Sequence, residues 1–372
     1  MNYDSFCKHF LEVFDEVVVV GRLFDIEDPA AKPVTGDRAR FIPLPSYSGP
    51  IQFAKNIIRI IKTLNSLFDS NTVYILRVPG TIPSLFSLMA FLRKAPFATQ
   101  CVADPADQLG KGSVHHPLRR LFRSLFIHIL RWQCQHSVTS MYVTKKSLQI
   151  HYPPALNKPT YSYTDLVLND SSYVSSARSN SSFNINKPVI VNVGMMVQLY
   201  KGQDVLLEAV KCCVTLGLDV SLRLIGDGEY RQYLEDLAVQ YGIKDRVVFV
   251  GKLLGGDAVQ REIDKCDIFA LPSRQEGLPR ALMEAMARGA PCFGTTVGGI
   301  PELLPEECLV PAGNVGALTD KIMNFCKDSK KLVRYSEENF AKAHEYHFEV
   351  VSKQRMAFYK DVKKLSRVSE YD

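Results

Sequence analysis

The sequence has 372 residues but no run of 18 or more apolar residues, so it offers no segment long enough to cross a bilayer as a helix. Residues 1–14 mix aspartate, lysine, histidine and glutamate, and therefore lack the apolar core of a secretory signal. These two absences predict a cytoplasmic protein.

Metal-binding and disulfide patterns are also missing. The nine cysteines include the adjacent pair Cys212 and Cys213 but no Cys-x-x-Cys pair, which excludes a disulfide framework and the usual zinc spacing. No Asp-x-Asp follows an expected strand in the second half of the chain, and no His/Cys/Asp cluster has ligand spacing. We therefore expect no metal and no cofactor, and most cysteines as small buried apolar residues.

Two hydrolase signatures are absent as well. The chain contains neither Gly-x-x-x-x-Gly-Lys-Ser/Thr nor Gly-x-Ser-x-Gly, which disfavours P-loop NTPases and serine hydrolases. It also lacks the aromatic stacking motifs of nucleic-acid-binding proteins, so we expect no nucleic-acid partner.

The chain does contain enough apolar material for two cores, since its hydrophobic fraction is 46%. Short apolar runs such as Val17–Val20 and Val73–Val78 alternate with helical periodicity, as at residues 53–68, which predicts an α/β fold with parallel sheets. A polar, serine-rich stretch without periodicity begins at Asn169, and a helical pattern spans residues 348–365. We expect domains at residues 1–170 and 188–345, a linker at 171–187 and a C-terminal helix within 346–372.

The net charge of +6 belongs to the first of these domains. Residues 1–170 contain 19 Lys+Arg against 13 Asp+Glu, whereas the remainder contains 26 of each. This excess points to an anionic surface or substrate on that side. Residues 118–132 interleave arginines with leucines and phenylalanines, which fits a basic amphipathic helix on an anionic membrane. A core-facing helix with solvated arginines explains the same pattern, and we favour it because the sequence does not show which face is exposed.

The most informative stretch is Ser273–Gly289. The apolar run Ile268–Leu271 predicts a buried parallel strand, and Pro279–Arg288 predicts a helix that starts at a proline and ends before a glycine. Glu276 then lies in the turn and Glu284 eight residues later, ~12 Å along the helix axis. That separation exceeds the ~5–9.5 Å between two carboxylates that act on one bond. It suits two ends of one elongated ligand with its anionic centre on the helix start, although a surface helix with two solvated glutamates has the same spacing.

Further motifs precede and follow this stretch. They are Val191–Gly194, Lys201–Ala209, Leu222–Gly228, Val247–Gly251 and Pro291–Glu302. In this order and at these spacings, residues 188–345 resemble the donor-binding half of the retaining glycosyltransferases of family 4, glycosyl transferases group 1, which have the GT-B fold. Over residues 1–170 the resemblance is much fainter.

The resemblance implies two Rossmann-like domains that face each other across a cleft, with the last helix crossing back to the first domain. Glu276 matches the glutamate that faces the transferred sugar, and Glu284 matches the glutamate whose carboxylate accepts hydrogen bonds from the ribose. Lys201 corresponds to the lysine that grips the diphosphate as a point charge. The other donor-binding positions that match family motifs are Gly194, Gly277, Leu278, Pro279 and Gly299.

The donor half departs from the family at one position. Directly after Gly194 the family usually has an arginine, but this chain has Met195. A charge-assisted hydrogen bond contributes ~1.5–3 kcal/mol, so this loss would weaken donor binding roughly ten- to a hundredfold. We expect another cation to reach the phosphates, either Arg274, which follows the strand by three residues, or Arg280.

The first domain matches the family loosely. Family members often use a histidine there near the transferred sugar, and the candidate catalytic residues are His116 and Asp104, with His115 and Asp107 as alternatives. The family opens with a strand and a glycine-rich turn, whereas here the first strand, Val17–Val20, follows a helix and has no Gly-Gly turn after it. The opening unit is therefore expected to be absent or replaced.

These observations together predict a hexosyltransferase-type enzyme of class EC 2.4. It would move a sugar from a nucleotide diphospho-sugar to a glycan or lipid-linked acceptor with retention of anomeric configuration, as in polysaccharide biosynthesis. It would work in the cytoplasm, where the basic first domain would place it on the inner face of the plasma membrane. Two alternatives remain, a non-catalytic nucleotide-sugar-binding subunit and a sugar-nucleotide epimerase of the same fold.

Overall fold

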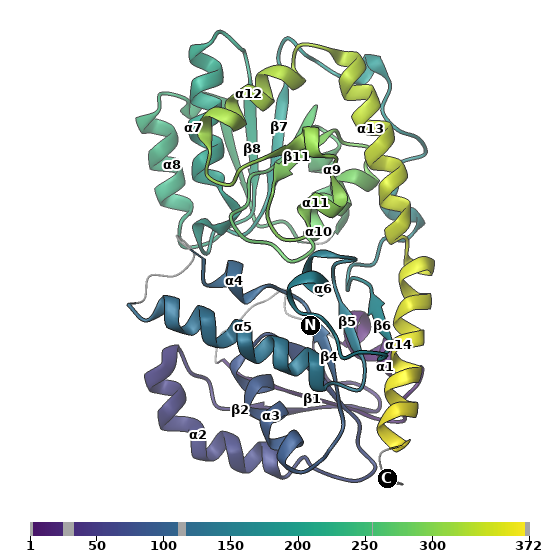
Figure 1. Ribbon diagram of the computed structural model, residues 1–372. Helices are drawn as coiled ribbons and strands as arrows, with labels where there is room; N and C mark the ends of the chain where they lie inside the picture. Colours follow the sequence, from purple (N-terminus) through teal and green to yellow (C-terminus); the bar gives the residue numbers. More distant parts are fainter. Residues whose placement is uncertain (1–2, 25–32, 111–116, 255, 369–372) are drawn as a thin grey trace.

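The computed structural model describes residues 3–24, 33–110, 117–254 and 256–368. Two parallel sheets with covering helices occupy separate halves of the molecule, one above the other in Figure 1. A further pair of parallel strands belongs to the N-terminal half. This is the α/β arrangement that the alternating apolar runs and helical stretches predicted.

The N-terminal half is built on a four-stranded parallel sheet in the order β3-β4-β5-β6, accompanied by the pair β1-β2. Its strands are β1 (Val17–Arg22), β2 (Ala39–Leu44), β3 (Tyr74–Val78), β4 (Phe97–Cys101), β5 (Ser140–Tyr142) and β6 (Thr160–Ser162). Its helices are α1 (Lys8–Phe10), which continues a π-helical turn at Tyr3–Cys7, α2 (Gly49–Asn65), α3 (Thr81–Leu92), α4 (Pro105–Gln108), α5 (Arg119–His136) and α6 (Ser147–His151). Since β3, β4 and β5 are neighbours in sequence order, right-handed crossovers place α3 and α5 on one face of the sheet.

The C-terminal half holds a six-stranded parallel sheet in the order β12-β11-β10-β7-β8-β9. Its strands are β7 (Val189–Val193), β8 (Ser221–Ile225), β9 (Val247–Gly251), β10 (Ile268–Leu271), β11 (Cys292–Thr295) and β12 (Leu309–Val310). Its helices are α7 (Gln203–Thr215), α8 (Arg231–Gln240), α9 (Gly256–Ile263), α10 (Arg280–Ala287), α11 (Ile300–Leu303), α12 (Val315–Phe325) and α13 (Ser329–Ala343). The chain builds outward from β7 to β9 and then returns to the other side of β7 with β10. Ligands of such doubly wound sheets bind at the carboxyl ends of the strands where this reversal occurs.

The central strands of the C-terminal sheet are apolar because helices cover both faces. All four residues of β10 are buried, as are the three central residues of β7. Between them, Asn192 donates a hydrogen bond of 2.8 Å to the carbonyl oxygen of Ala270, so the buried amide side chain of β7 is partnered through its Nδ2 atom. The edge at which β7 and β10 end is thereby held rigidly.

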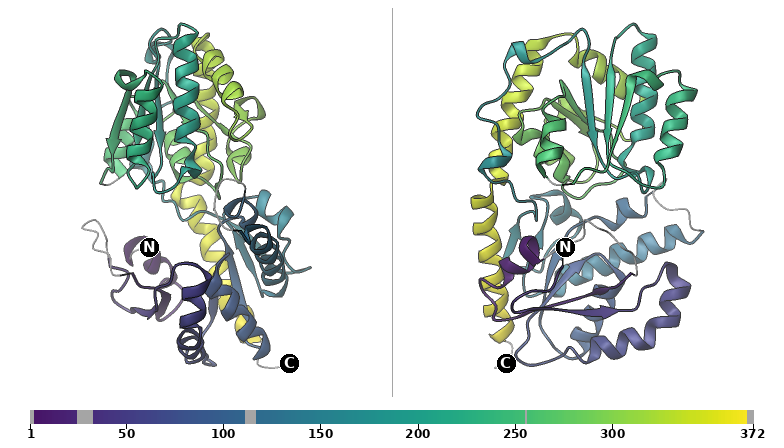
Figure 2. Two further views of the ribbon diagram at one scale, coloured as in Figure 1. Left: turned by 90° about the vertical axis from the view of Figure 1, so that its left-hand side faces the viewer. Right: turned by 180° about the vertical axis from the view of Figure 1, so that it is seen from behind.

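The last helix, α14 (Phe348–Val368), starts near the boundary between the halves and runs along one side of the N-terminal half, as the yellow helix in Figures 1 and 2 shows. It packs on β4 and β6 of the N-terminal half. Asp361 accepts a hydrogen bond of 2.5 Å from the hydroxyl of Tyr161, and Lys363 donates one of 2.7 Å to the carbonyl oxygen of Val13. Phe358 is fully buried under this helix. The end of the chain is therefore part of the N-terminal core.

The polar stretch that was predicted to link the halves is fixed to the C-terminal half. It contains two 3-10 turns, Asp170–Ser172 and Asn180–Ser182. Between them, the guanidinium of Arg178 donates to the carbonyl oxygens of Ile263 at 3.1 Å, of Arg288 at 3.2 Å and of Cys266. One arginine thus satisfies three carbonyl groups at the ends of neighbouring elements.

The element predictions from sequence hold with small shifts at the ends. The helix expected over Pro279–Arg288 begins at Arg280, with Pro279 at its N-cap, and ends at Ala287. All nine cysteines are free, eight of them buried and Cys212 half-buried, as the spacing predicted. Within the described ranges, none of the helices combines the length and apolar character needed to cross a bilayer.

Candidate active site

The candidate site lies at the carboxyl ends of β7 and β10, where the strand order reverses. Gly194 follows β7 directly, and the turn Ser273–Pro279 follows β10 and leads into α10. The amide of Arg274 donates a hydrogen bond of 2.7 Å to the carbonyl oxygen of Tyr200, which ties this turn to the segment in front of α7. Two motifs that are about eighty residues apart in sequence therefore meet at one edge of the sheet.

Lys201 and Glu276 form the centre of this site. The ammonium Nζ of Lys201 lies 2.6 Å from Oε1 of Glu276, and the hydroxyl of Ser273 donates a hydrogen bond of 2.7 Å to the same oxygen. The Lys201 side chain is 16% exposed and that of Glu276 only 8%. Buried charges of this kind need a partner, because an isolated carboxylate in this environment would be strongly penalised. The two residues that sequence matched to sugar and phosphate contacts are thus direct neighbours.

Gly194 makes room for this pair. A Cβ atom on Gly194 would lie 2.8 Å from Cγ of Lys201, closer than real Cβ contacts allow. Any other residue at this position would push the lysine side chain away from Glu276. The glycine therefore sets the path of Lys201 across the end of β7.

Glu284 lies on α10, eight residues after Glu276. Its side chain is half-buried, and burial raises the pKa of its carboxyl group, while the nearby charge of Arg280 acts in the opposite direction. Among the described residues, no side chain or amide donates a hydrogen bond to this carboxylate. No side chain caps the start of α10 either, so its first amides remain open to an anion. The helix thus presents unsatisfied polar groups at its start and on its flank.

Glycine turns bring the two halves of the molecule into contact beside the site. A Cβ atom on Gly277 would lie 2.5 Å from the carbonyl oxygen of Val102, which follows β4 in the N-terminal half. The amide of Gly299 donates a hydrogen bond of 2.7 Å to the carbonyl oxygen of Gly277, so both glycine turns lie together. The adjoining Leu278 is buried and precedes Pro279 at the N-cap of α10. The predicted glycine positions are therefore at the boundary between the halves.

Glu302 fixes the same boundary. Its carboxylate accepts hydrogen bonds from the amides of Lys145 at 2.6 Å, Lys146 at 3.0 Å and Ser147 at 2.6 Å, which open α6 in the N-terminal half. Lys145 also forms an ion pair of 2.5 Å with Glu345. A carboxylate at a helix start is stabilised by the free amides there. The sequence motif that ends in Glu302 gave no indication of this partner, which is about 155 residues away.

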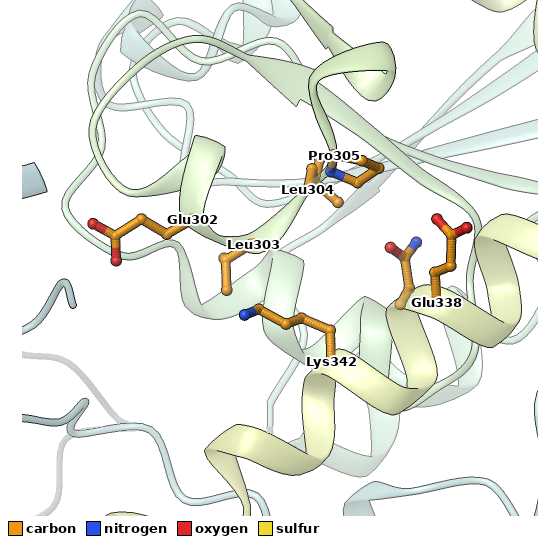
Figure 3. A pocket seen from close by; sticks show the side chains of 7 residues that line it. Glu302, Leu303, Leu304, Pro305, Glu338 and Lys342 are labelled. Atoms are coloured by element: carbon orange, nitrogen blue, oxygen red, sulfur yellow. The ribbon is translucent and has the colours of Figure 1, made fainter. Parts of the chain in front are cut away.

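Figure 3 shows a pocket on the other side of α11, of about 280 Å³. Its lining residues are Glu302, Leu303, Leu304 and Pro305, together with Glu338, Asn339 and Lys342 of α13, and Figure 3 shows the carboxylate of Glu302 turned away from the others. It contains none of the predicted catalytic or donor-binding residues. We assign it no part in the candidate site.

The N-terminal half contributes a polar cluster around Asp104, which follows β4. The carboxylate of Asp104 accepts a hydrogen bond of 2.7 Å from the amide of Ala106 and another from the hydroxyl of Tyr152, and its other oxygen lies 3.2 Å from Nδ1 of His151. Asp104 is buried, whereas the His151 side chain is 57% exposed. Burial and, secondarily, the charge of Asp104 raise the pKa of Asp107 to about 6. Asp104 thus holds a histidine whose outer edge meets solvent.

His151 is the histidine that sequence reasoning missed. The predicted candidates, His115 and His116, lie outside the described residues. His151 is 47 residues after Asp104 and follows an unremarkable helical turn, so no local pattern links the two. A search for histidines near the strand end could not find it, because α5 and β5 intervene.

Arg274 is engaged with the protein itself. Its guanidinium forms two hydrogen bonds with the carboxylate of Asp204, at 2.7 and 2.8 Å, and a third of 2.6 Å with the carbonyl oxygen of Leu199. These contacts fix the 3-10 turn that carries Lys201. Met195 is 42% exposed beside this segment. The structure thus pairs Arg274, one of the two cations that the sequence analysis expected to reach the phosphates, with Asp204.

Comparison with known proteins agrees with this architecture. Residues 187–328 match the family described as Glycosyl transferases group 1. The chain is 24% identical to Protein CapJ of Staphylococcus aureus over 335 residues, covering 89% of this chain and 82% of CapJ. It is 30% identical to N-acetyl-alpha-D-glucosaminyl L-malate synthase of Bacillus anthracis over 148 residues, which cover 39% of this chain and 38% of that enzyme.

Solved structures share the whole fold. Sucrose-phosphate synthase from Thermosynechococcus elongatus superposes with a TM-score of 0.71 at 17% identity, covering 93% of this chain and 89% of the other. HepE from Anabaena, in complex with UDP-glucose, gives a TM-score of 0.66 at 16% identity, covering 93% and 99%. These likenesses confirm the predicted fold class. The chain therefore has the GT-B fold, and its residues 187–328 are similar to the family described as Glycosyl transferases group 1.

Proposed function

We propose that this protein is a retaining glycosyltransferase that moves a hexose-type sugar from a nucleotide diphospho-sugar to a glycan or lipid-linked acceptor. The observation that carries the proposal is the buried pair of Lys201 and Glu276, placed where the strand order reverses and beside the open start of α10. The related HepE structure holds UDP-glucose, and relatives include a putative colanic acid biosynthesis glycosyltransferase, WcaL of Escherichia coli. The HepE complex supports a nucleotide diphospho-sugar as donor, and WcaL supports a role in polysaccharide biosynthesis.

Donor binding would rearrange the charges in this site. The diphosphate would lie on the first amides of α10, and the ammonium of Lys201 would turn from Glu276 towards it. Glu276, freed from its cation, would accept hydrogen bonds from the sugar hydroxyls, and Glu284 would accept them from the ribose. As the bond between the anomeric carbon and the diphosphate breaks, Lys201 and the helix start would stabilise the developing negative charge. No step of this scheme requires a metal ion.

The acceptor would enter from the N-terminal half. The contact between Gly277 and Val102 brings the end of β4, and with it Asp104, to the boundary beside the donor turn. We assign His151, oriented by Asp104, to the acceptor hydroxyl, because its exposed side chain is held by a buried carboxylate. Contact between the halves would exclude water and so limit hydrolysis of the donor.

A thermal-shift screen tests the donor assignment. Wild-type protein and the Glu284→Ala variant are melted with UDP, GDP, ADP and their sugars, and we expect one nucleotide series to stabilise the wild type. The variant should respond much less, since a hydrogen bond to a charged group contributes ~1.5–3 kcal/mol. If no nucleotide raises the melting temperature, the donor site is wrong. An equal response of both proteins would refute the ribose role of Glu284.

A non-catalytic nucleotide-sugar-binding subunit is the second candidate, and Met195 is the observation that favours it. This exposed thioether stands where the family usually supplies a guanidinium, and Arg274 is already paired with Asp204. Isothermal titration and donor-turnover assays separate the two functions, because the second predicts binding without transfer or hydrolysis. Conversion of the donor without any acceptor would instead indicate an epimerase.

A further inference from the structure

The outer face of helices α2, α3 and α5 carries an unusual number of exposed apolar side chains. On α2, Ile51 is 73% and Ile58 69% exposed. On α5, Leu121 is 62% exposed, and on α3, Leu92 is 73% exposed. Further exposed apolar residues on these helices are Ile61, Leu88, Phe91, Leu118 and Leu125. We call these residues together the α2–α3–α5 face.

The exposed residues of α2 form a stripe along the helix. Ile51, Ala54, Ile58 and Ile61 follow each other at intervals of three and four residues, so they lie on one side of the helix. The opposite side is the one that packs on the core, where Ile60 and Leu64 are buried. The helix is therefore apolar on two sides, and only one of them has a partner in the described structure.

The three helices form one layer. The ring of Phe91 on α3 packs against that of Trp132 on α5, with 5.3 Å between the centroids. Arg93, the C-cap of α3, contacts α2: its guanidinium donates a hydrogen bond to Asn65 of α2 and lies over the ring of Phe68. Figure 1 shows the three helices following one another on the side of the molecule opposite α14. The exposed apolar residues therefore belong to three neighbouring helices.

The charge of this layer has a single sign. Residues 38–164 contain sixteen lysines and arginines, three aspartates and no glutamate. None of the acidic residues belongs to α2, α3 or α5. Lys55, Arg59 and Lys62 run beside the isoleucine stripe, and within the described residues they form no ion pair. The face thus combines apolar side chains with Lys55, Arg59 and Lys62 of α2, which pair with no carboxylate among the described residues.

We propose that the α2–α3–α5 face docks on a lipid bilayer with anionic head groups. Helices that lie in such an interface bury one apolar side among the acyl chains while lysines and arginines meet the lipid phosphates. A nucleic acid would use the cations but leave the isoleucines and leucines in water. An acceptor carried by a lipid would then reach the candidate site from the same side of the molecule, although docking itself does not depend on the proposed reaction.

Vesicle sedimentation tests this proposal with the full chain. Wild-type protein is mixed with vesicles of phosphatidylcholine alone or with phosphatidylglycerol added, in low and high salt. We expect at least tenfold tighter binding to the anionic vesicles, because each basic residue near such a surface contributes roughly fivefold. High salt should weaken this binding without abolishing it, since the apolar contacts are not screened.

Two double variants and one matched control locate the surface. We expect Ile51→Ser/Ile58→Ser and Leu121→Ser/Leu125→Ser each to weaken vesicle binding at least tenfold. Leu216→Ser/Val239→Ser exchanges two equally exposed apolar residues of the C-terminal half, and its binding should equal that of the wild type. All the exchanged residues are exposed, so we expect each variant to keep the melting temperature of the wild type. Measuring this temperature distinguishes loss of vesicle binding from loss of the fold.

Three outcomes would overturn the proposal. The first is absence of vesicle binding by the wild type. The second is binding that the apolar exchanges leave unchanged, which would reduce the interaction to charge alone. The third is wild-type self-association in ultracentrifugation that the same exchanges abolish, which would assign the face to a second copy of the chain.

Discussion

At the scale of single residues, the pair of Lys201 and Glu276 combines a structural cost with a functional role. Both side chains are largely buried, and taking two charges out of water costs several kcal/mol per ion before their attraction is counted. Such a pair is a weak source of stability. Its position at the ends of β7 and β10 agrees with a role in binding, in which an anionic ligand of higher charge competes with Glu276 for the ammonium of Lys201.

We predict that Lys201→Met destabilises the protein by about 3 kcal/mol, because it leaves the carboxylate of Glu276 buried with the hydroxyl of Ser273 as its one remaining donor among the described residues. The double variant Lys201→Met/Glu276→Gln should recover most of this loss, since it buries no uncompensated charge. Urea unfolding of the wild type and the variants measures both effects. If the double variant is no more stable than Lys201→Met, the two residues do not act as a pair.

Glu284 allows a prediction about pH. Burial raises the pKa of its carboxyl group above the ordinary value of 4.5, so the folded state disfavours the carboxylate. Above the raised pKa, ionised Glu284 therefore opposes folding, and this penalty disappears as the pH falls towards the unfolded value. Glu284→Gln should melt at a higher temperature than the wild type at pH 8, and the difference should narrow towards pH 5.

The same variant should bind its nucleotide ten- to a hundredfold more weakly, because a charged acceptor for the ribose is lost. Glu337→Gln, an exposed glutamate of α13, serves as the control and should change neither property. A destabilised Glu284→Gln at pH 8 would show that the carboxylate is satisfied in the free protein.

Sequence reasoning identified residues well where a local pattern carried the information. The glycine at 194, the lysine at 201 and the turn after β10 follow from short motifs, and the structure brings them together. It failed where a partner is remote in sequence. Arg274 meets Asp204, and Asp104 meets His151, through contacts that depend on the packing of whole elements. No local composition reveals such pairs.

At the scale of elements, the start of α6 is stabilised from the other half of the molecule. The N-cap residue of this five-residue helix, Lys146, makes no side-chain cap, and the hydroxyl of Thr144 accepts a hydrogen bond of 3.0 Å from the amide of Leu148. The carboxylate of Glu302 accepts hydrogen bonds from the amides of residues 145–147, which precede and open the helix. A short helix with so few internal hydrogen bonds depends on such a contact. The hydrogen bonds by which Glu302 stabilises the start of α6 are therefore also hydrogen bonds between the two halves of the molecule.

We predict that Glu302→Ala loosens this boundary. The variant loses three hydrogen bonds from amides to a charged group, each of which contributes ~1.5–3 kcal/mol when intact. Hydrogen exchange at residues 145–147 should become at least tenfold faster. The radius of gyration from X-ray scattering should increase as the halves separate more often.

Glu306→Ala provides the control, because Glu306 is exposed and lies only one turn further along the chain. Its exchange pattern should match that of the wild type. Unchanged exchange at residues 145–147 in Glu302→Ala would mean that other contacts, such as the ion pair of Lys145 with Glu345, are sufficient to hold α6.

Element boundaries were predicted closely because apolar runs and helical periodicity are local. The buried strand at Ile268–Leu271 and the helix that follows Pro279 have the expected limits. The serine-rich stretch was read only as a loop or a connection, yet Arg178 fixes it to three carbonyl groups of the C-terminal half. Polar composition correctly indicated a lack of regular structure, but it does not report hydrogen bonds to distant carbonyl groups.

At the scale of the whole molecule, the two halves are built on separate sheets, and α14 joins the last described residues of the chain to the first half. Arg355 donates a hydrogen bond of 3.1 Å to the carbonyl oxygen of Thr164, and Asp361 and Lys363 hold Tyr161 and the backbone of Val13. The N-terminal half therefore cannot complete its core until the whole chain is present. The order of strands in the sequence predicted the sheets, but it did not show how far the N-terminal core depends on α14.

Phe358 provides a test of whether the halves unfold separately. Its side chain is fully buried on α14, and its ring lies 5.8 Å from that of Tyr161 and 6.1 Å from that of Tyr163. Phe358→Ala should cost about 3–5 kcal/mol through lost apolar burial and the cavity left behind. This loss should fall on the N-terminal half, because all these contacts belong to it.

The single tryptophan of the chain, Trp132, lies on α5 and so reports on the N-terminal half alone. In Phe358→Ala, we expect the urea transition seen by Trp132 fluorescence to move to lower concentration than the transition seen by far-ultraviolet circular dichroism. Phe325→Ala is the matched variant of the C-terminal half, where this buried ring packs on those of Phe293 and Tyr335, and it should leave the fluorescence transition nearly unchanged. If the fluorescence and circular dichroism transitions coincide in both variants, the two halves unfold as one cooperative unit. The contacts of Glu302 and Gly277 between the halves would then account for this coupling.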